Sequence, residues 1–176
     1  MKEFARLLRK KVDRLFLVVW PPWGEENEFD IDISFGFVFK NEPIELCVIS
    51  VDKDELWLPH TYYQPLPKSD YTWEDFYPRI KMWMKAEDNN CTIDKEYYDV
   101  TTCELFERII GYEISGIEFI SVEGNPQPFG VRILFEDDYI ISIPNSDGNT
   151  VETKAFNKND GLEKFKHLGK IVFSKV

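Results

Sequence analysis

Three residues in this 176-residue sequence have the types and spacing of a site for phosphodiester chemistry: Asp138, Glu152 and Lys154. Two carboxylates could hold a divalent cation, and a lysine beside them could help a water molecule attack the phosphorus. Glu152 and Lys154 are two residues apart, so in a strand their side chains would share one face, as this chemistry requires.

The arrangement of an aspartate followed by a strand with Glu-x-Lys resembles the PD-(D/E)xK nucleases, in which such acids hold the cation and the lysine assists the water. The same residues also have simpler interpretations. Asp137-Asp138 is typical of a tight turn, and alternating charges on an edge strand prevent aggregation. The formal net charge of −11 would repel nucleic acid. A metal-dependent phosphodiesterase or nuclease using Asp138, Glu152 and Lys154 is therefore the alternative function.

A second group of residues favours protein recognition. Trp20 and Trp23 flank a Pro-Pro pair and precede Glu25 and Glu26. Aromatic side chains beside acids suit a contact anchor with a charged rim. Alternatively, both tryptophans cover the core, because large aromatic side chains are mostly buried. With the acids of other expected turns, the predicted partner interface consists of Trp20, Trp23, Glu25, Glu26, Asp52, Asp54, Glu55, Asp137 and Asp138.

The composition favours binding over catalysis. The chain has 32 acidic and 21 basic residues, together with 5 Trp, 8 Tyr and 14 Phe. An acidic surface attracts basic partners and speeds their encounter. The sequence has no GxSxG nucleophile motif, no glycine-rich phosphate loop and no cluster of metal-ligand residues around its 2 histidines. We therefore predict a non-enzymatic protein without a metal or cofactor, whose partner is a basic protein and neither nucleic acid nor a membrane.

The cysteines and the N-terminal sequence predict a cytoplasmic location. Three cysteines are too few for an extracellular disulfide scaffold, which favours reduced thiols, although the spacing of Cys91 and Cys103 would also allow one bridge. The apolar run at residues 15–20 is shorter than the core of a signal peptide. No stretch reaches the roughly 18 apolar residues of a membrane span.

Hydrophobic periodicity predicts the elements that would position these residues. Residues 28–39 alternate strictly, which predicts a strand with Phe29, Ile31, Ile33, Phe35, Phe37 and Phe39 on one face. The other strands are expected at 15–20, 44–51, 113–122, 130–136, 139–143, 150–154 and 171–173, and the segment 52–71 reads as an irregular aromatic loop. Helices are expected over 3–14 and 73–86, after the Thr101-x-x-Glu104 capping box, and near 162–168.

The strands come in runs without βαβ alternation, which predicts an α+β fold. We expect an antiparallel, meander-rich sheet of about six to eight strands, with three or four helices packed mainly on one face. The length favours a single globular domain over residues 1–176.

Residues 129–149 have the order strand, acidic turn, strand, Asp-Gly turn. With the acidic and aromatic-rich composition, this stretch resembles the immunity proteins of bacterial polymorphic-toxin and contact-dependent-inhibition systems. The resemblance implies a single α+β domain without an active site. It also implies a mechanism, in which the protein occludes the active site of a basic toxin and its acids mimic the charge of phosphate groups.

Overall fold

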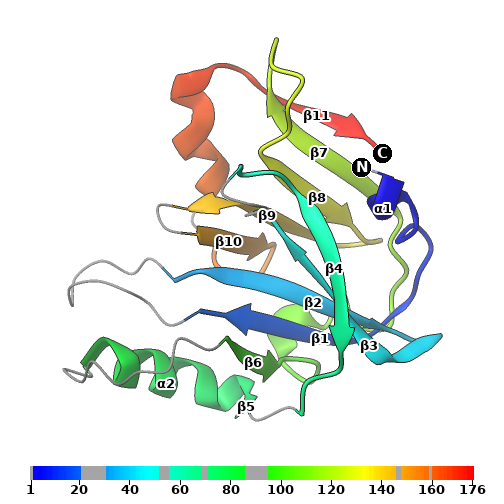
Figure 1. Ribbon diagram of the computed structural model, residues 1–176, viewed down its shortest axis with the longest axis vertical. Helices are drawn as coiled ribbons and strands as arrows, with labels where there is room; N and C mark the ends of the chain where they lie inside the picture. The colour runs from blue at the N-terminus through cyan, green and yellow to red at the C-terminus, as the bar shows by residue number, and fades with distance from the viewer. Residues whose placement is uncertain are drawn as a thin grey trace.

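Two β-sheets form the framework of the described chain (Figure 1). The structure is a computed structural model that describes residues 2–20, 31–51, 56–68, 71–85, 95–145, 148–158 and 160–176, with the backbone alone at 83–85. Six strands form the first sheet, in the order β4-β3-β2-β1-β6-β5: β1 (Val12–Val19), β2 (Ile33–Phe39), β3 (Glu42–Ser50), β4 (His60–Pro65), β5 (Tyr71–Thr72) and β6 (Glu96–Asp99). Five strands form the second, in the order β10-β9-β8-β7-β11: β7 (Gly116–Val122), β8 (Gly130–Leu134), β9 (Tyr139–Asn145), β10 (Gly148–Thr153) and β11 (Ile171–Lys175).

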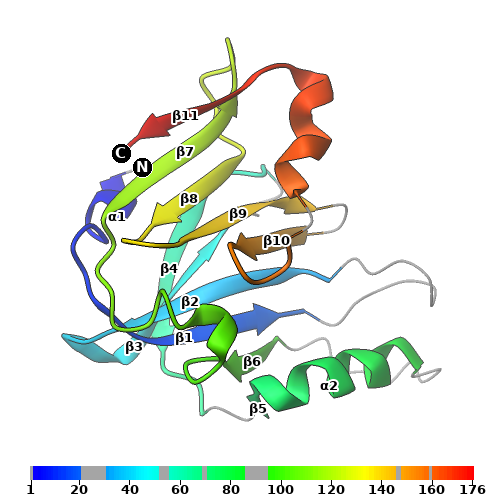
Figure 2. The ribbon, with the colours of Figure 1, turned by 180° about the vertical axis from the view of Figure 1, so that it is seen from behind.

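The helices of the described ranges are short. They are α1 (Lys2–Ala5), α2 (Trp73–Lys85) and the 3-10 helices η1 (Glu104–Phe106) and η2 (Gly161–Leu168). The orange helix before β11 in Figures 1 and 2 is η2, which packs Leu162 and Phe165 against the outer side of the five-stranded sheet. Within those same ranges, no helix has both the length and the apolar character needed to cross a bilayer.

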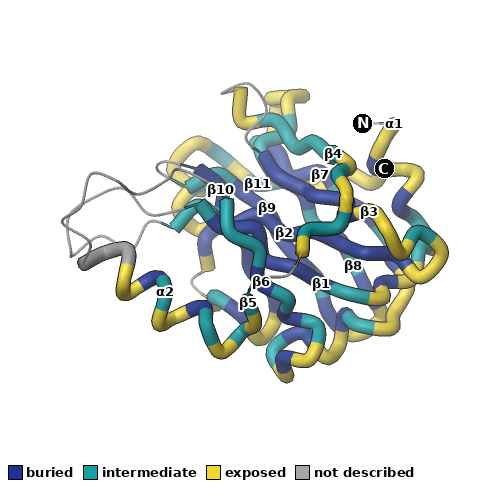
Figure 3. The backbone as a smooth tube through the Cα atoms, turned by 60° about the horizontal axis from the view of Figure 1, so that its bottom comes forward, coloured by how far each residue is buried: buried dark blue, intermediate teal, exposed yellow. Residues whose placement is uncertain are grey.

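The facing sides of the two sheets enclose the main hydrophobic core. Leu15 of β1 and Phe35 and Phe37 of β2 belong to the same fully buried cluster as Val131 and Ile133 of β8. Figure 3 shows the middle strands of both sheets as buried and the periphery as exposed. The strand predicted at residues 28–39 is confirmed over β2, whose residues Ile33, Phe35, Phe37 and Phe39 all belong to this core, although both faces of β2 are buried. Phe29 lies outside the described residues.

The predicted α+β fold class is wrong. Instead of one sheet with helices on one face, the described chain is mostly β, with eleven strands in two sheets. The physical reason is that the strands after residue 115 have an apolar face of their own, with Ile117, Phe119 and Val131 fully or nearly buried. Two apolar sheet faces bury each other. The hydrophobic pattern of a strand shows which of its faces is apolar, but it does not show which other element covers that face.

The helix predicted over residues 3–14 is also wrong beyond its first turn. Arg9 has a φ of 64°, a left-handed conformation through which a right-handed helix cannot continue. The chain then enters β1 at Val12. Leu7 and Val12 are both fully buried, but Leu7 lies in the turn after α1 and Val12 begins β1. The apolar spacing of residues 3–14 therefore marks residues that are buried, but it does not show that they form one helix.

Two further predictions need correction, because the structure assigns these segments to other elements. Residues 60–65, expected to be irregular, form β4. Thr101 does not start an α-helix: its hydroxyl donates to Asp99, and it accepts the Leu15 N–H at 3.1 Å. Only the 3-10 helix η1 follows.

Helix α2 agrees with the prediction over 73–86, and it is held by contacts at its start and with β6. Asp75 Oδ2 accepts hydrogen bonds from the Thr72 N–H at 2.9 Å and the Thr72 hydroxyl at 3.0 Å. Arg79 forms a two-point ion pair with Glu96 of β6, with an Nε–Oε2 distance of 2.7 Å. These contacts fix α2 along β5 and β6.

The six-stranded sheet is curved, because side chains of β4 meet side chains of β6 and of the residue before it, although three strands separate β4 from β6. Lys95 Nζ lies 3.0 Å from the Tyr62 hydroxyl. Gly36 in β2 allows close packing on this concave side, since a Cβ there would lie 2.8 Å from the Leu46 side chain. Glycine within a strand often marks such a bend.

One end of the molecule collects the ends of several strands, and we call it the stem end. Val19 at the end of β1 pairs with Ile33 at the start of β2 and with Glu96 at the start of β6. Ser50 at the end of β3 pairs with His60 at the start of β4. The stem end is on the left of Figure 1, where β1 and β9 end and β2, β6 and β10 begin.

Candidate functional site

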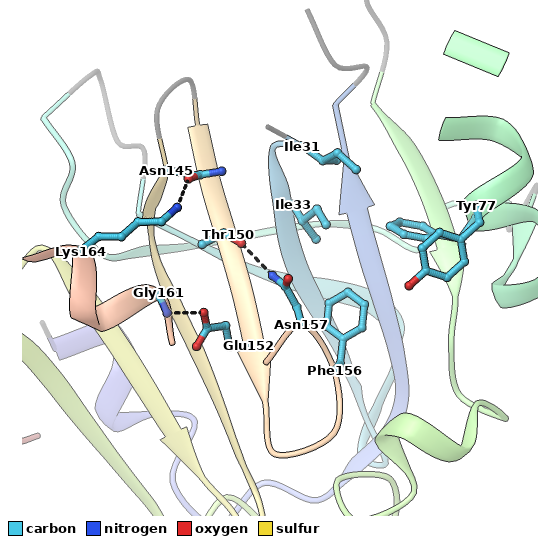
Figure 4. A pocket seen from close by; sticks show the side chains of 11 residues that line it. Ile31, Ile33, Tyr77, Asn145, Thr150, Glu152, Phe156, Asn157, Gly161 and Lys164 are labelled. Carbon is cyan, nitrogen blue, oxygen red and sulfur yellow. Dashed lines mark hydrogen bonds between the residues drawn. The ribbon is translucent and has the colours of Figure 1, made fainter. Parts of the chain in front are cut away.

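A pocket of about 280 Å³ lies between β2, α2, β10 and η2, on the stem-end side (Figure 4). We call it the β10 pocket. One of its walls is apolar and the other carries amides, a hydroxyl, a lysine and a buried carboxylate. The residues that line it are Ile31, Ile33, Phe76, Tyr77, Asn145, Thr150, Glu152, Phe156, Asn157, Gly161 and Lys164.

Glu152 gives the β10 pocket its chemistry. The residue is 7% exposed, and the Gly161 N–H donates to its Oε1 at 2.7 Å (Figure 4). Burial raises the pKa of the Glu152 carboxyl, and nearby Asp160 raises it further, whereas the Gly161 N–H and Lys164 lower it. Ionising a buried carboxyl is costly without a neighbouring cation. A positive charge close to Glu152 would therefore stabilise its ionised form.

The approach of η2 to β10 depends on glycine at position 161. A Cβ at Gly161 would lie 2.6 Å from Glu152 Oε1 and 2.9 Å from Ile143 Cδ1. Both distances are shorter than a Cβ contact allows, so the Glu152 carboxylate and the Ile143 methyl group would have to move aside. The hydrogen bond that holds the carboxylate would then lengthen.

Hydrogen bonds between lining residues hold some of the other polar groups of the pocket. Asn157 Nδ2 donates to Thr150 Oγ1 at 3.0 Å. Lys164 Nζ lies 3.4 Å from Asn145 Oδ1, at the edge of the pocket (Figure 4). An ammonium group thus already contacts an amide oxygen of this wall.

A buried polar seam holds β10 against β2, next to the lining residues Ile33 and Thr150. Asn149 is fully buried, and its backbone N–H donates to Asp32 Oδ1 at 3.0 Å. Its Nδ2 donates to the Ile33 carbonyl at 2.8 Å and lies 3.3 Å from Ser34 Oγ. Its Oδ1 accepts from Ser142 Oγ at 3.0 Å. The hydrogen bonds of Asn149 with Asp32, Ile33 and Ser34 therefore connect the two sheets.

The structure describes three of the nine residues predicted to form a partner interface, and these three do not lie together. Trp20 is half-buried at the stem end, with the Lys95 ammonium 5.4 Å from its ring centre. Asp137 and Asp138 lie in the turn from β8 to β9, at the opposite end of the five-stranded sheet. The remaining residues, Trp23, Glu25, Glu26, Asp52, Asp54 and Glu55, lie outside the described residues.

The residues of the alternative nuclease pattern have hydrogen-bonding roles in the fold. Asp138 is 4% exposed, and its Oδ1 accepts the N–H groups of Tyr139 at 2.7 Å and Lys154 at 3.0 Å. The Lys154 ammonium contacts the Asp137 carbonyl, while the Glu152 carboxylate is bonded to η2. Across the described ranges, no three His, Cys, Asp or Glu side chains gather so that they could hold a metal ion.

Neither described cysteine has an exposed thiol. Cys47 and Cys103 are buried free thiols, and Cys91 lies outside the described residues. Burial raises the pKa of Cys47 to about 11. A thiol with so high a pKa is almost wholly protonated at neutral pH and is a poor nucleophile.

Comparisons with protein-family models, curated proteins and solved structures find no match for this chain. The β10 pocket therefore has to be interpreted from its own chemistry. Sequence patterns singled out Glu152, but for phosphodiester chemistry, and they missed Asn145, Asn157 and Lys164. No local motif connects residues as distant in sequence as Ile31 and Lys164.

Proposed function

We propose that this chain is a small acidic binding protein, of the kind represented by immunity-type inhibitors, that occludes a basic protein partner such as a toxin domain. The distribution of charge carries the proposal. Twelve of the 32 acidic residues but only Lys53 of the 21 basic residues fall outside the described ranges, which leaves 20 of each within them. The described body is thus electrically balanced, and the net charge of −11 comes from the sequences between its parts.

Most of this surplus belongs to sequences that join strands at the stem end. Residues 21–30 connect β1 to β2 and contain four acids, and residues 52–55 connect β3 to β4 and contain three. Residues 86–94 connect α2 to β6 and contain three acids, and residues 146–147 connect β9 to β10 and contain one. Charge of one sign tied to one end attracts a partner of the opposite sign and orients it.

Aromatic side chains near the same end supply contact area for a partner. Trp57, before β4, is 36% exposed, and Tyr77 on α2 is 54% exposed. Aromatic anchors of this type, surrounded by polar and charged groups, carry much of the binding energy in protein interfaces. In a partner that acts on nucleic acid, carboxylates at this end would occupy the positions of substrate phosphates.

The test is co-expression with the carboxyl-terminal domain of a secreted toxin encoded directly upstream of this chain in its genome. We expect the chain to protect growth and to form a complex whose association rate falls by about tenfold or more as salt is raised. A chain that leaves the toxin active, or a complex whose association rate does not depend on salt, contradicts the proposal. A genome without a secreted protein gene beside this one counts against the immunity assignment.

A further inference from the structure

The apolar wall of the β10 pocket suits the methylene chain of a long side chain. Ile31, Ile33, Phe76 and Phe156 supply this wall in a volume of about 280 Å³. Lysine and arginine bury their methylene stems along apolar surface while the charged head remains in a polar environment. A short polar ligand would leave this wall uncovered.

The other wall offers a head group its counter-ion. Glu152 is more than nine-tenths buried, and the single hydrogen bond found for its carboxylate within the described ranges is the Gly161 N–H on Oε1. None of the ion pairs among the described residues includes Glu152. Glu152 Oε2 thus has acceptor capacity left in a place where a carboxylate is costly to keep without a cation.

The chain itself shows that this wall accepts an ammonium group. The exposed Lys164 holds its Nζ 3.4 Å from Asn145 Oδ1, which is the long end of hydrogen-bond distance. Lys164 is therefore a weakly held cation at the edge of the pocket, and it competes with any cation that enters.

We propose that the β10 pocket is a socket for one lysine or arginine side chain of the basic partner, with Glu152 as its counter-ion. The inference rests on the proposed function and adds where the partner is anchored. The sequences that join strands at the stem end supply the negative charge that attracts the partner, and Tyr77 at the pocket offers an exposed ring to the entering cation.

The probes are N-acetyl-lysine methylamide and N-acetyl-arginine methylamide, with N-acetyl-norleucine methylamide as the uncharged match for lysine. Each is titrated into the whole chain while backbone amide shifts are followed by NMR. We expect saturable shifts at Gly161 and at other lining residues for the cationic probes, and affinity about tenfold lower for norleucine. Equal binding of norleucine, or no saturable shift with either cation, overturns the socket.

Two variants give effects of opposite sign. Glu152→Gln keeps an oxygen for the Gly161 N–H but removes the charge, so we expect about a tenfold loss of affinity for the cationic probes. Lys164→Met removes the competing cation and should raise their affinity by a few fold. Unchanged probe affinity in Glu152→Gln, or a loss in Lys164→Met, contradicts the proposal. Unchanged amide shifts outside the pocket show that each variant has folded.

The toxin complex separates the two proposals. A wild-type complex that Glu152→Gln weakens supports the socket. A complex that Glu152→Gln leaves at full affinity overturns the socket and leaves the proposed function standing. A wild-type chain that binds no basic partner overturns the proposed function.

Discussion

At the scale of single residues, Glu152 combines a structural and a chemical role. It fastens η2 to β10 through the Gly161 N–H, and it places a buried carboxylate in a pocket whose opposite wall is apolar. The first role needs only an oxygen acceptor, whereas the second depends on charge. Substitution by glutamine separates the two roles because it keeps the acceptor and removes the charge.

Glu152→Gln should change stability in a way that depends on pH. The folded-state pKa of this carboxyl is raised above its ordinary value of 4.5, so the folded protein holds the proton more tightly than the unfolded chain. The contribution of the carboxyl to the free energy of unfolding is therefore complete below the ordinary pKa and falls as pH rises through the raised value.

We expect Glu152→Gln to be more stable than the wild type at neutral pH, with the difference shrinking toward pH 4. Urea denaturation of both proteins between about pH 4 and pH 8 measures this. A difference that is constant with pH, or one that grows in acid, would show that the buried charge is not its cause.

At the scale of elements, two close approaches hold the strands in place. Gly36 lets Leu46 pack across β2 on the concave side of the six-stranded sheet. Asn149 joins β10 to β2 through side-chain and backbone hydrogen bonds. The first is a matter of shape and the second of hydrogen bonding, so the two respond differently to substitution.

Gly36→Ala should destabilise the protein by about 1–3 kcal/mol, because the new methyl group would overlap the Leu46 side chain. Leu46→Ala alone should cost about 2–5 kcal/mol through loss of buried volume. The double variant should cost less than the sum of the two by about 1 kcal/mol, since each change makes room for the other. Additive free energies of unfolding would contradict this packing.

Asn149→Ala should lower the free energy of unfolding by about 1–3 kcal/mol, because it leaves the buried Ile33 carbonyl and Ser142 hydroxyl without this partner. The matched control is Asn125→Ala, at an exposed asparagine in the turn after β7. We expect the control to change stability by less than about 0.5 kcal/mol. Similar losses of unfolding free energy in both variants would show that the buried hydrogen bonds of Asn149 stabilise the fold no more than those of an exposed asparagine.

At the scale of the whole molecule, the excess negative charge and the two sheets belong to different parts of the sequence. The described body has as many basic as acidic residues, and the acidic surplus lies in sequences joined mainly to the stem end. The field of such a molecule is directional, which speeds encounter with a basic partner but adds less to the lifetime of the complex.

Glu25→Gln with Glu26→Gln should slow association with a basic partner by a few fold and leave the dissociation rate nearly unchanged. The control is Glu104→Gln with Glu107→Gln, which makes the same change in net charge at exposed residues that follow the far end of β6. Stopped-flow association at low salt compares the two variants. Equal slowing by both would mean that total charge matters and its position does not.

The sequence by itself determined which residues are buried and where many strands run. The alternation over β2, the strands of the meander and the helix α2 follow from spacing, because burial of one face imposes a period of two or about 3.6 residues. The charge of −11 and the absence of known catalytic motifs are likewise properties of the sequence.

The tertiary structure alone decided what each apolar face packs against. The apolar spacing of residues 3–14 is equally compatible with one helix and with the observed turn followed by a strand, and only burial against both sheets distinguishes them. The β10 pocket joins Ile31, Tyr77 and Glu152 from three separate segments. Local periodicity contains no information about contacts between such distant residues, since these depend on how the two sheets stack.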